Sequence, residues 1–91
     1  MSERNQVTGR QIAAARTLAG LGQAELAAAA KISVPTLRRM EASEGEASGY
    51  ANNVDAVRRA LESAGVEFVA ENGGGAGVRL RKTSAQSERR E

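Results

Sequence analysis

The stretch from Gln23 to Glu41, QAELAAAAKISVPTLRRME, contains two short helical patterns separated by a three-residue connector. The first pattern covers residues 23–30, and one of its faces carries three side chains that are expected to point inward: Leu26, Ala27 and Ala30. Two short helices joined by so few residues must cross closely, so the crossing needs a small side chain. Ala27 supplies it, and the stretch therefore predicts a pair of crossed helices.

The second helix of the pair is predicted to cover residues 34–42. Ser33 is a favourable N-cap residue, and Pro35 lies in the first turn, where a missing N–H leaves no helical hydrogen bond unmade. Leu37 and Met40 are three residues apart and therefore share the face that packs inward. The N-terminal end of this helix is expected to project outward, and the major groove of DNA is wide enough to admit one helix.

The patterns outside this stretch complete the predicted fold class, which is mainly α: four helices followed by a C-terminal two-stranded β-hairpin. One helix is expected at residues 8–19, with Thr8 as its cap. The fourth is expected to be capped by Asn52 or Asn53 and to end at Gly65. Its apolar side chains recur at helical spacing: Val54, Val57, Leu61 and Ala64.

The hairpin is predicted from two short strands, residues 66–69 and 78–81, joined by a glycine-rich loop at residues 71–77. An isolated two-stranded hairpin is only marginally stable, so its apolar side chains need a further partner. Either the strands of two protomers pair edge to edge, or Phe68 packs against a second protomer. The predicted dimerisation residues are Val66, Phe68, Val78 and Leu80.

The composition excludes several kinds of chemistry. The 91 residues include no Cys and no His, which removes disulfides, thiolate chemistry, the usual zinc sites and imidazole catalysis. No catalytic set of residues is visible, so the chain is not expected to be an enzyme or to bind a metal or cofactor. It has no membrane-spanning apolar run and no signal-like N-terminus, so we expect it in the cytoplasm. Residues 1–40 carry six basic side chains against two acidic ones, which fits a polyanionic partner.

The crossed-helix stretch resembles the Cro/C1-type helix-turn-helix family, often called the XRE family. The resemblance covers roughly residues 8–65 and is carried by Gln23, Leu26-Ala27, Ile32-Ser33, Pro35-Thr36-Leu37 and Arg39-Met40-Glu41. That family usually has Gly in the turn, where φ is positive, whereas this chain has Lys31. Together with the strand patterns and the polar composition of the C-terminal residues, the resemblance divides the chain into an N-terminal tail (1–7), a helix-turn-helix domain (8–65), the hairpin (66–82) and a disordered tail (83–91).

The resemblance also implies which side chains contact DNA. The implied DNA-binding residues are Gln23, Ser33, Val34, Pro35, Thr36, Arg38 and Arg39. Gln23 would hydrogen-bond a phosphate, residues 34–36 would face base edges, and Arg39 would contact a base or phosphate deeper along the same face. Arg16 is implied to pair with Glu41. Three cations of the hairpin would either touch the DNA backbone or decorate an exposed strand edge: Arg79, Arg81 and Lys82.

These implications lead to a sequence-specific transcriptional regulator of double-stranded DNA, expected to repress by binding an inverted-repeat operator as a homodimer. No small-molecule ligand and no membrane association are expected. The same helical scaffold also suits a protein-interaction module, such as an antitoxin-like partner or an anti-activator, because fold alone does not establish DNA binding. Salt-dependent binding to duplex DNA distinguishes the two classes.

Overall fold

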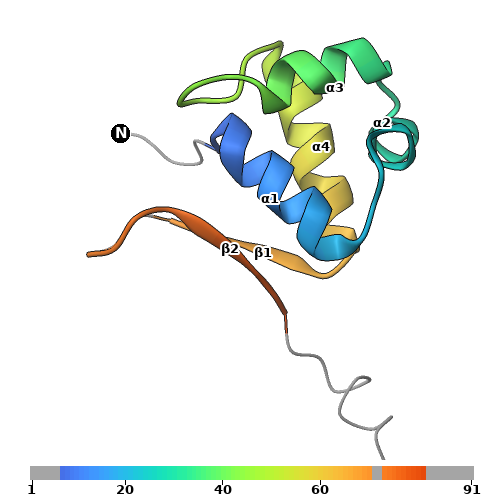
Figure 1. Cartoon of the computed structure of the whole chain (residues 1–91). Helices are drawn as coiled ribbons and strands as arrows, with labels where there is room; N and C mark the ends of the chain where they lie inside the picture. The colour runs from blue at the N-terminus through green and yellow to red at the C-terminus, as the bar shows by residue number, and fades with distance from the viewer. Residues whose placement is uncertain (1–6, 71–72, 82–91) are drawn as a thin grey trace, which may run out of the picture.

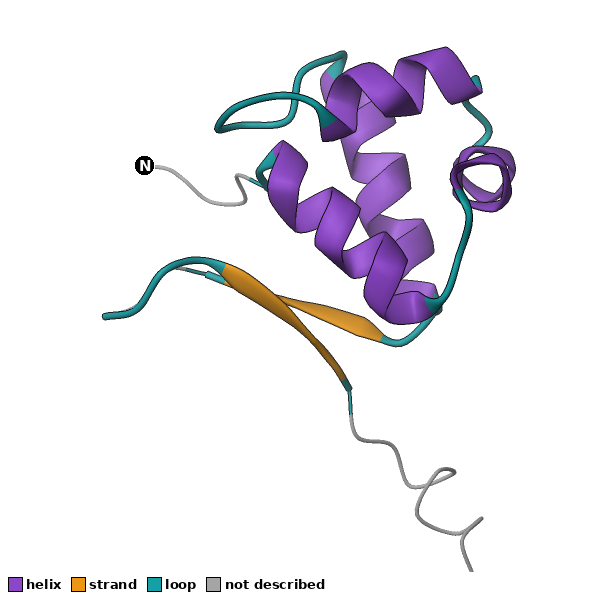
Figure 2. Cartoon of the chain, viewed as in Figure 1, coloured by secondary structure: helices purple, strands orange, loops and turns teal. Residues whose placement is uncertain are grey.

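Four helices and a two-stranded antiparallel hairpin form the fold, as the sequence predicted (Figures 1 and 2). The structure is a computed structural model that describes residues 7–70 and 73–81. Its elements in chain order are α1 (Gly9–Ala19), α2 (Gln23–Ala30), α3 (Val34–Glu41), α4 (Ala51–Ser63), β1 (Val66–Val69) and β2 (Gly77–Leu80). The predicted bounds of the first three helices are thus confirmed to within one residue.

Helix α1 begins and ends where the local signals place it. The Thr8 Oγ1 accepts a hydrogen bond from the Gln11 amide at 3.0 Å, and the Gln11 Oε1 accepts one from the Thr8 amide at 2.9 Å. This reciprocal capping box satisfies two amides that the first turn would otherwise leave unpaired. Gly20 ends the helix in the left-handed conformation, with φ 76°.

The predicted cap of α4 is wrong. The helix begins at Ala51, one residue before Asn52, and its N-cap residue is Tyr50, whose side chain makes no capping hydrogen bond. The Tyr50 carbonyl instead accepts hydrogen bonds from the amides of Asn53 and Val54. The preceding Gly49 has φ 120°, so the loop already turns the chain into the helix without help from an asparagine.

The helices enclose one core that the hairpin extends. Its fully buried larger side chains are Ile12, Leu26, Leu37, Met40, Val57, Leu61 and Val66. Val66 has no exposed surface, so the prediction that it contacts a second protomer is wrong: it is covered by the chain's own helices. Val7 is also part of this core rather than of a tail, and its carbonyl accepts a hydrogen bond from the Ala47 amide at 2.9 Å.

The hairpin lies against α1 and α4, on the side of these helices that faces away from α3 (Figure 1). Its register pairs Val66 with Leu80 and Phe68 with Val78, so these four side chains share one face of the sheet. Phe68 and Val78 are half-buried against the core. The hairpin is therefore not isolated, because most of its apolar face is covered within the chain.

Two polar side chains attach the hairpin to the helices. The Gln11 Nε2 donates to the carbonyls of Gly77 at 3.0 Å and of Val69 at 3.5 Å, close to the turn. At the other end, the Arg81 Nη2 donates to the Glu62 carbonyl at 2.9 Å. Gln11 is buried, so these bonds satisfy an amide that would be costly to leave unpaired.

Several predictions fall on residues outside the described ranges. These are the N-terminal tail before Val7, the first part of the hairpin loop at residues 71–72, Lys82 and the predicted disordered tail at 83–91. In the part of the chain that is described, no helix combines the length and the apolar character needed to cross a membrane.

Candidate nucleic-acid interface

The turn between α2 and α3 has the backbone conformation that the resemblance implied. Lys31 lies in the left-handed region, with φ 61° and ψ 45°, where the family usually has Gly. The Ile32 amide donates to the Ala27 carbonyl at 3.0 Å, which closes the end of α2. The chain thus makes this turn at a non-glycine residue, at a cost of roughly 1 kcal/mol.

Ser33 caps α3, as predicted. Its Oγ accepts a hydrogen bond from the Thr36 amide at 3.2 Å and donates one to the Thr36 Oγ1 at 2.8 Å. Pro35 lies in the first turn of the helix. Ser33 is exposed, so the cap and the first turn of α3 lie at the surface of the domain.

The two sides of α3 differ sharply in burial. Leu37 and Met40 are fully buried, which confirms the predicted inward face. Pro35, Arg38 and Arg39 are exposed, and their spacing of three and four residues puts them on one side of the helix. In Figures 1 and 2, α3 runs along the edge of the helical domain farthest from the hairpin. The surface presented there is basic, because Arg38 and Arg39 are exposed on it.

Two predicted contact residues at the start of α3 are less open than the arginines. Val34 is half-buried and packs against the core, so only part of its side chain is available to a base. Thr36 is also half-buried, with its hydroxyl hydrogen-bonded to Ser33. The most accessible predicted contacts of α3 are therefore Pro35, Arg38 and Arg39.

The basic side chains of the described residues fall into two groups. The first group is held by other atoms of the chain: Arg16, Arg58, Arg59, Arg79 and Arg81. The second group is exposed, and its side chains make no hydrogen bond or ion pair within residues 7–70 and 73–81: Arg10, Lys31, Arg38 and Arg39. Three of these four cations belong to α3 or to the turn that precedes it.

The Glu41 carboxylate connects three helices behind this surface. Arg16 on α1 donates from Nε to the Glu41 Oε2 at 2.7 Å and from Nη2 to Oε1 at 3.1 Å. Gln23, which opens α2, donates from Nε2 to the same Oε1 at 3.0 Å. The hydrogen bond to Glu41 raises the pKa of the Arg16 guanidinium above its ordinary value, so this guanidinium stays charged at any physiological pH.

The predicted phosphate ligand Gln23 is half-buried and already uses one amide donor on Glu41. Its amide nitrogen carries a second N–H, and the bond to Glu41 fixes the direction of the side chain. Tyr50 and Asn52, which lie after α3 at the start of α4, are exposed. The hairpin cations Arg79 and Arg81 are bound within the chain and lie away from α3.

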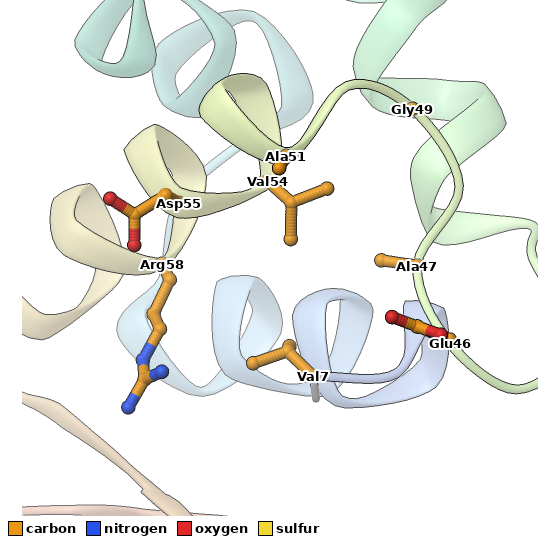
Figure 3. Close-up of a pocket in the computed structure, with 8 residues that line it drawn as sticks. All are labelled: Val7, Glu46, Ala47, Gly49, Ala51, Val54, Asp55 and Arg58. Carbon is orange, nitrogen blue, oxygen red and sulfur yellow. The ribbon is translucent and has the colours of Figure 1, made fainter. Parts of the chain in front are cut away.

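A small hollow of about 230 Å³ lies where the loop after α3 meets the start of α4 (Figure 3). Val7 and Val54 point toward each other across it, and charged groups of Glu46, Asp55 and Arg58 lie around them. None of the residues predicted to bind DNA lines this hollow. It is therefore separate from the basic surface of α3.

No protein-family model matches this chain, and no curated protein matches it significantly.

Lys31 is a basic residue of this surface that the family resemblance did not mark as a DNA contact. Its ammonium group is exposed immediately before α3, and its side chain has no partner among the described residues. A basic residue in the connector of a crossed-helix pair predicts a DNA contact, because the connector lies beside the exposed end of the second helix. We therefore include Lys31 with Arg38 and Arg39 in the basic surface.

Proposed function

We propose that the chain is a sequence-specific double-stranded DNA-binding regulator that inserts α3 into the major groove. The observation that carries the proposal is the pair Arg38 and Arg39, exposed and unpaired within the described residues, on a helix whose opposite face is fully buried. An exposed arginine that is already paired gives up that interaction when it binds phosphate. Within the described residues, Arg38 and Arg39 have no such interaction to lose.

The proposed mechanism is occupancy of a site rather than a chemical reaction. Contacts to phosphate, from Lys31 and from the remaining N–H of Gln23, set the position of the domain on the duplex. The exposed side of α3 then reads base edges, with Arg39 suited to a bidentate contact with guanine. Eight residues of helix read only a few base pairs, so useful specificity requires two copies on half-sites ~34 Å apart. Such occupancy of a promoter represses transcription by excluding polymerase.

The test begins with selection of bound duplexes from a random DNA pool, followed by titration of the recovered site. Arg39→Ala should weaken binding to the selected site by ~1–3 kcal/mol and relax the preference at one base position. Arg59→Ala is the matched control, because Arg59 is an exposed arginine on α4 that pairs with Asp55 at 2.7 Å. It should leave the affinity unchanged.

Two outcomes would contradict the proposal. Equal affinity of wild type and the Arg39 variant for the selected site would remove α3 from recognition. A complete lack of salt-dependent binding to any duplex would exclude DNA as the partner and would favour a protein-interaction module on the same scaffold.

A further inference from the structure

A shallow apolar groove runs between α1 and β2, outside the surface proposed to bind DNA. It has a volume of about 690 Å³ and is lined by Ala13, Ala14, Thr17, Leu18 and Val78. None of these side chains is charged. Leu18 is 42% exposed, and Leu80, which follows Val78 on the same face of β2, is 51% exposed. The two are the most exposed Leu side chains of the described residues, and both belong to the elements that form this groove.

The outer edge of β2 adds to this groove backbone groups that are unpaired within the described part of the chain. The Arg81 amide donates to the Gly65 carbonyl at 2.7 Å, so Gly65 and Arg81 form a hydrogen-bonded pair of the antiparallel ladder. Hydrogen-bonded and non-hydrogen-bonded pairs alternate along such a ladder, so Val78 and Leu80 direct their N–H and C=O groups away from β1. An occupant of the groove must therefore bring both apolar side chains and an extended backbone.

The remaining segments of the chain do not have that chemistry. Residues 82–91, KTSAQSERRE, follow β2 after Arg81, but five of the ten are charged and Ala85 is the only apolar one. Residues 1–6, MSERNQ, contain one apolar side chain. A second copy of the chain, in contrast, brings a matching β2 edge and a matching α1 strip.

We propose that two copies associate through this surface, with their β2 strands paired antiparallel and their α1 helices in contact through Ala14 and Leu18. Antiparallel pairing places the two-fold axis perpendicular to the joined sheet, so all helices lie on one side of it. Because α3 lies on the side of α1 away from the hairpin, both α3 helices then face the same direction (Figure 1). The role of this dimer rests on the proposed function, because a two-fold symmetric DNA site needs both α3 helices to face the same direction.

This interface keeps the predicted edge-to-edge pairing of strands but changes the set of residues that form it. Val66 is fully buried and Phe68 is half-buried on β1, the strand farther from the groove, so neither carries this interface. Leu18 on α1 and the outer edge of β2 carry it instead. Val78 and Leu80 are common to the prediction and the proposal.

Sedimentation equilibrium of the full chain without DNA tests the proposal. Wild type should be dimeric at tens of micromolar, and Leu18→Glu should raise the dissociation constant by about tenfold or more, as for loss of an apolar anchor. Leu80→Pro should do the same by removing an outward N–H, which an edge strand tolerates without unfolding. Ala29→Glu, an equivalent change at an exposed position of α2, should remain dimeric. Circular dichroism melting verifies that each variant is folded.

Hydrogen exchange at the Val78 and Leu80 amides identifies the occupant. In the proposed dimer both amides are protected, and Leu18→Glu exposes them. A wild type that is monomeric throughout this range overturns the proposal, as does an unchanged dimer in the folded Leu18 and Leu80 variants. If the two amides are protected in a monomer and lose that protection when residues 82–91 are deleted, then this segment, and not a second copy, covers the outer edge of β2. Because these measurements contain no DNA, their failure is distinct from a failure of α3 to bind DNA.

Discussion

Glu41, the last residue of α3, and Arg16, on α1, form a two-bond ion pair with N–O distances of 2.7 and 3.1 Å. The carboxylate side chain is 8% exposed and the guanidinium side chain 20% exposed. This pair, which the family resemblance implied, is confirmed. It fixes the C-terminal end of α3, the helix that presents Arg38 and Arg39. The same ion pair therefore contributes to the stability of the domain and to the orientation of its basic surface.

Glu41→Gln should lower the free energy of unfolding by about 2 kcal/mol, because it leaves the Arg16 charge largely out of water without its counter-ion. Urea denaturation measures the change. In a double-mutant cycle with Arg16→Met, the combined loss should be clearly smaller than the sum of the two single losses. Strictly additive losses would show that the pair contributes no interaction energy.

Gly9→Ala should destabilise the domain by about 1–3 kcal/mol, because a Cβ there would lie 2.5 Å from the Met40 carbonyl oxygen and 2.7 Å from that of Ser43. Both contacts are backbone atoms that cannot rotate away. Thermal denaturation measures the effect, and Gly74→Ala is the control, because its Cβ would meet nothing within 4 Å. Equal melting temperatures for the two variants would contradict the close approach of α1 to the end of α3.

Lys31→Gly should stabilise the fold by about 1 kcal/mol, because glycine adopts the left-handed turn without the clash that a Cβ causes. Lys31→Ala keeps the Cβ and should leave stability nearly unchanged. Chemical denaturation of the three proteins side by side makes the comparison. A Gly variant less stable than the Ala variant would show that residue 31 does not adopt positive φ. Both variants should weaken DNA binding, since each removes a phosphate contact.

Gln11→Glu should loosen the hairpin while keeping α1 capped. The carboxylate still accepts from the Thr8 amide, but it has no N–H for the carbonyls of Val69 and Gly77. Hydrogen exchange should quicken at the amides of β1 and β2 and change little in α2 and α3. Gln11→Leu, which also removes the cap acceptor, should destabilise α1 as well. Unchanged exchange in the strands would mean that Gln11 does not hold the hairpin.

The basic surface predicts a particular salt dependence of DNA binding. Arg38→Ala should reduce the slope of log affinity against log salt by about one, as expected when one phosphate contact is lost. Titrations at several ionic strengths measure the slope, and Arg59→Ala should leave it as in wild type. If Arg38→Ala keeps the wild-type slope but alters the base preference, then Arg38 contacts a base rather than a phosphate.

Local sequence signals predicted the first three helices because their ends depend on neighbouring residues only. Thr8, Gly20 and Ser33 act over three or four positions, and so do the inward pairs such as Leu37 and Met40. The start of α4 was not predictable in this way. The Asn residues are good caps in isolation, but the loop before Tyr50 had already set the helix entry.

By itself, then, the sequence determined which segments are helix or strand, and which face of α3 is apolar, because both follow from interactions within a few residues along the chain. Only the tertiary structure decided that Val66 is internal, that Gln11 reaches carbonyls 58 and 66 residues away, and that Leu18 shares an apolar groove with Val78. These features depend on how the hairpin lies across α1 and α4. That placement is set by packing between distant segments, which no local pattern of side chains encodes.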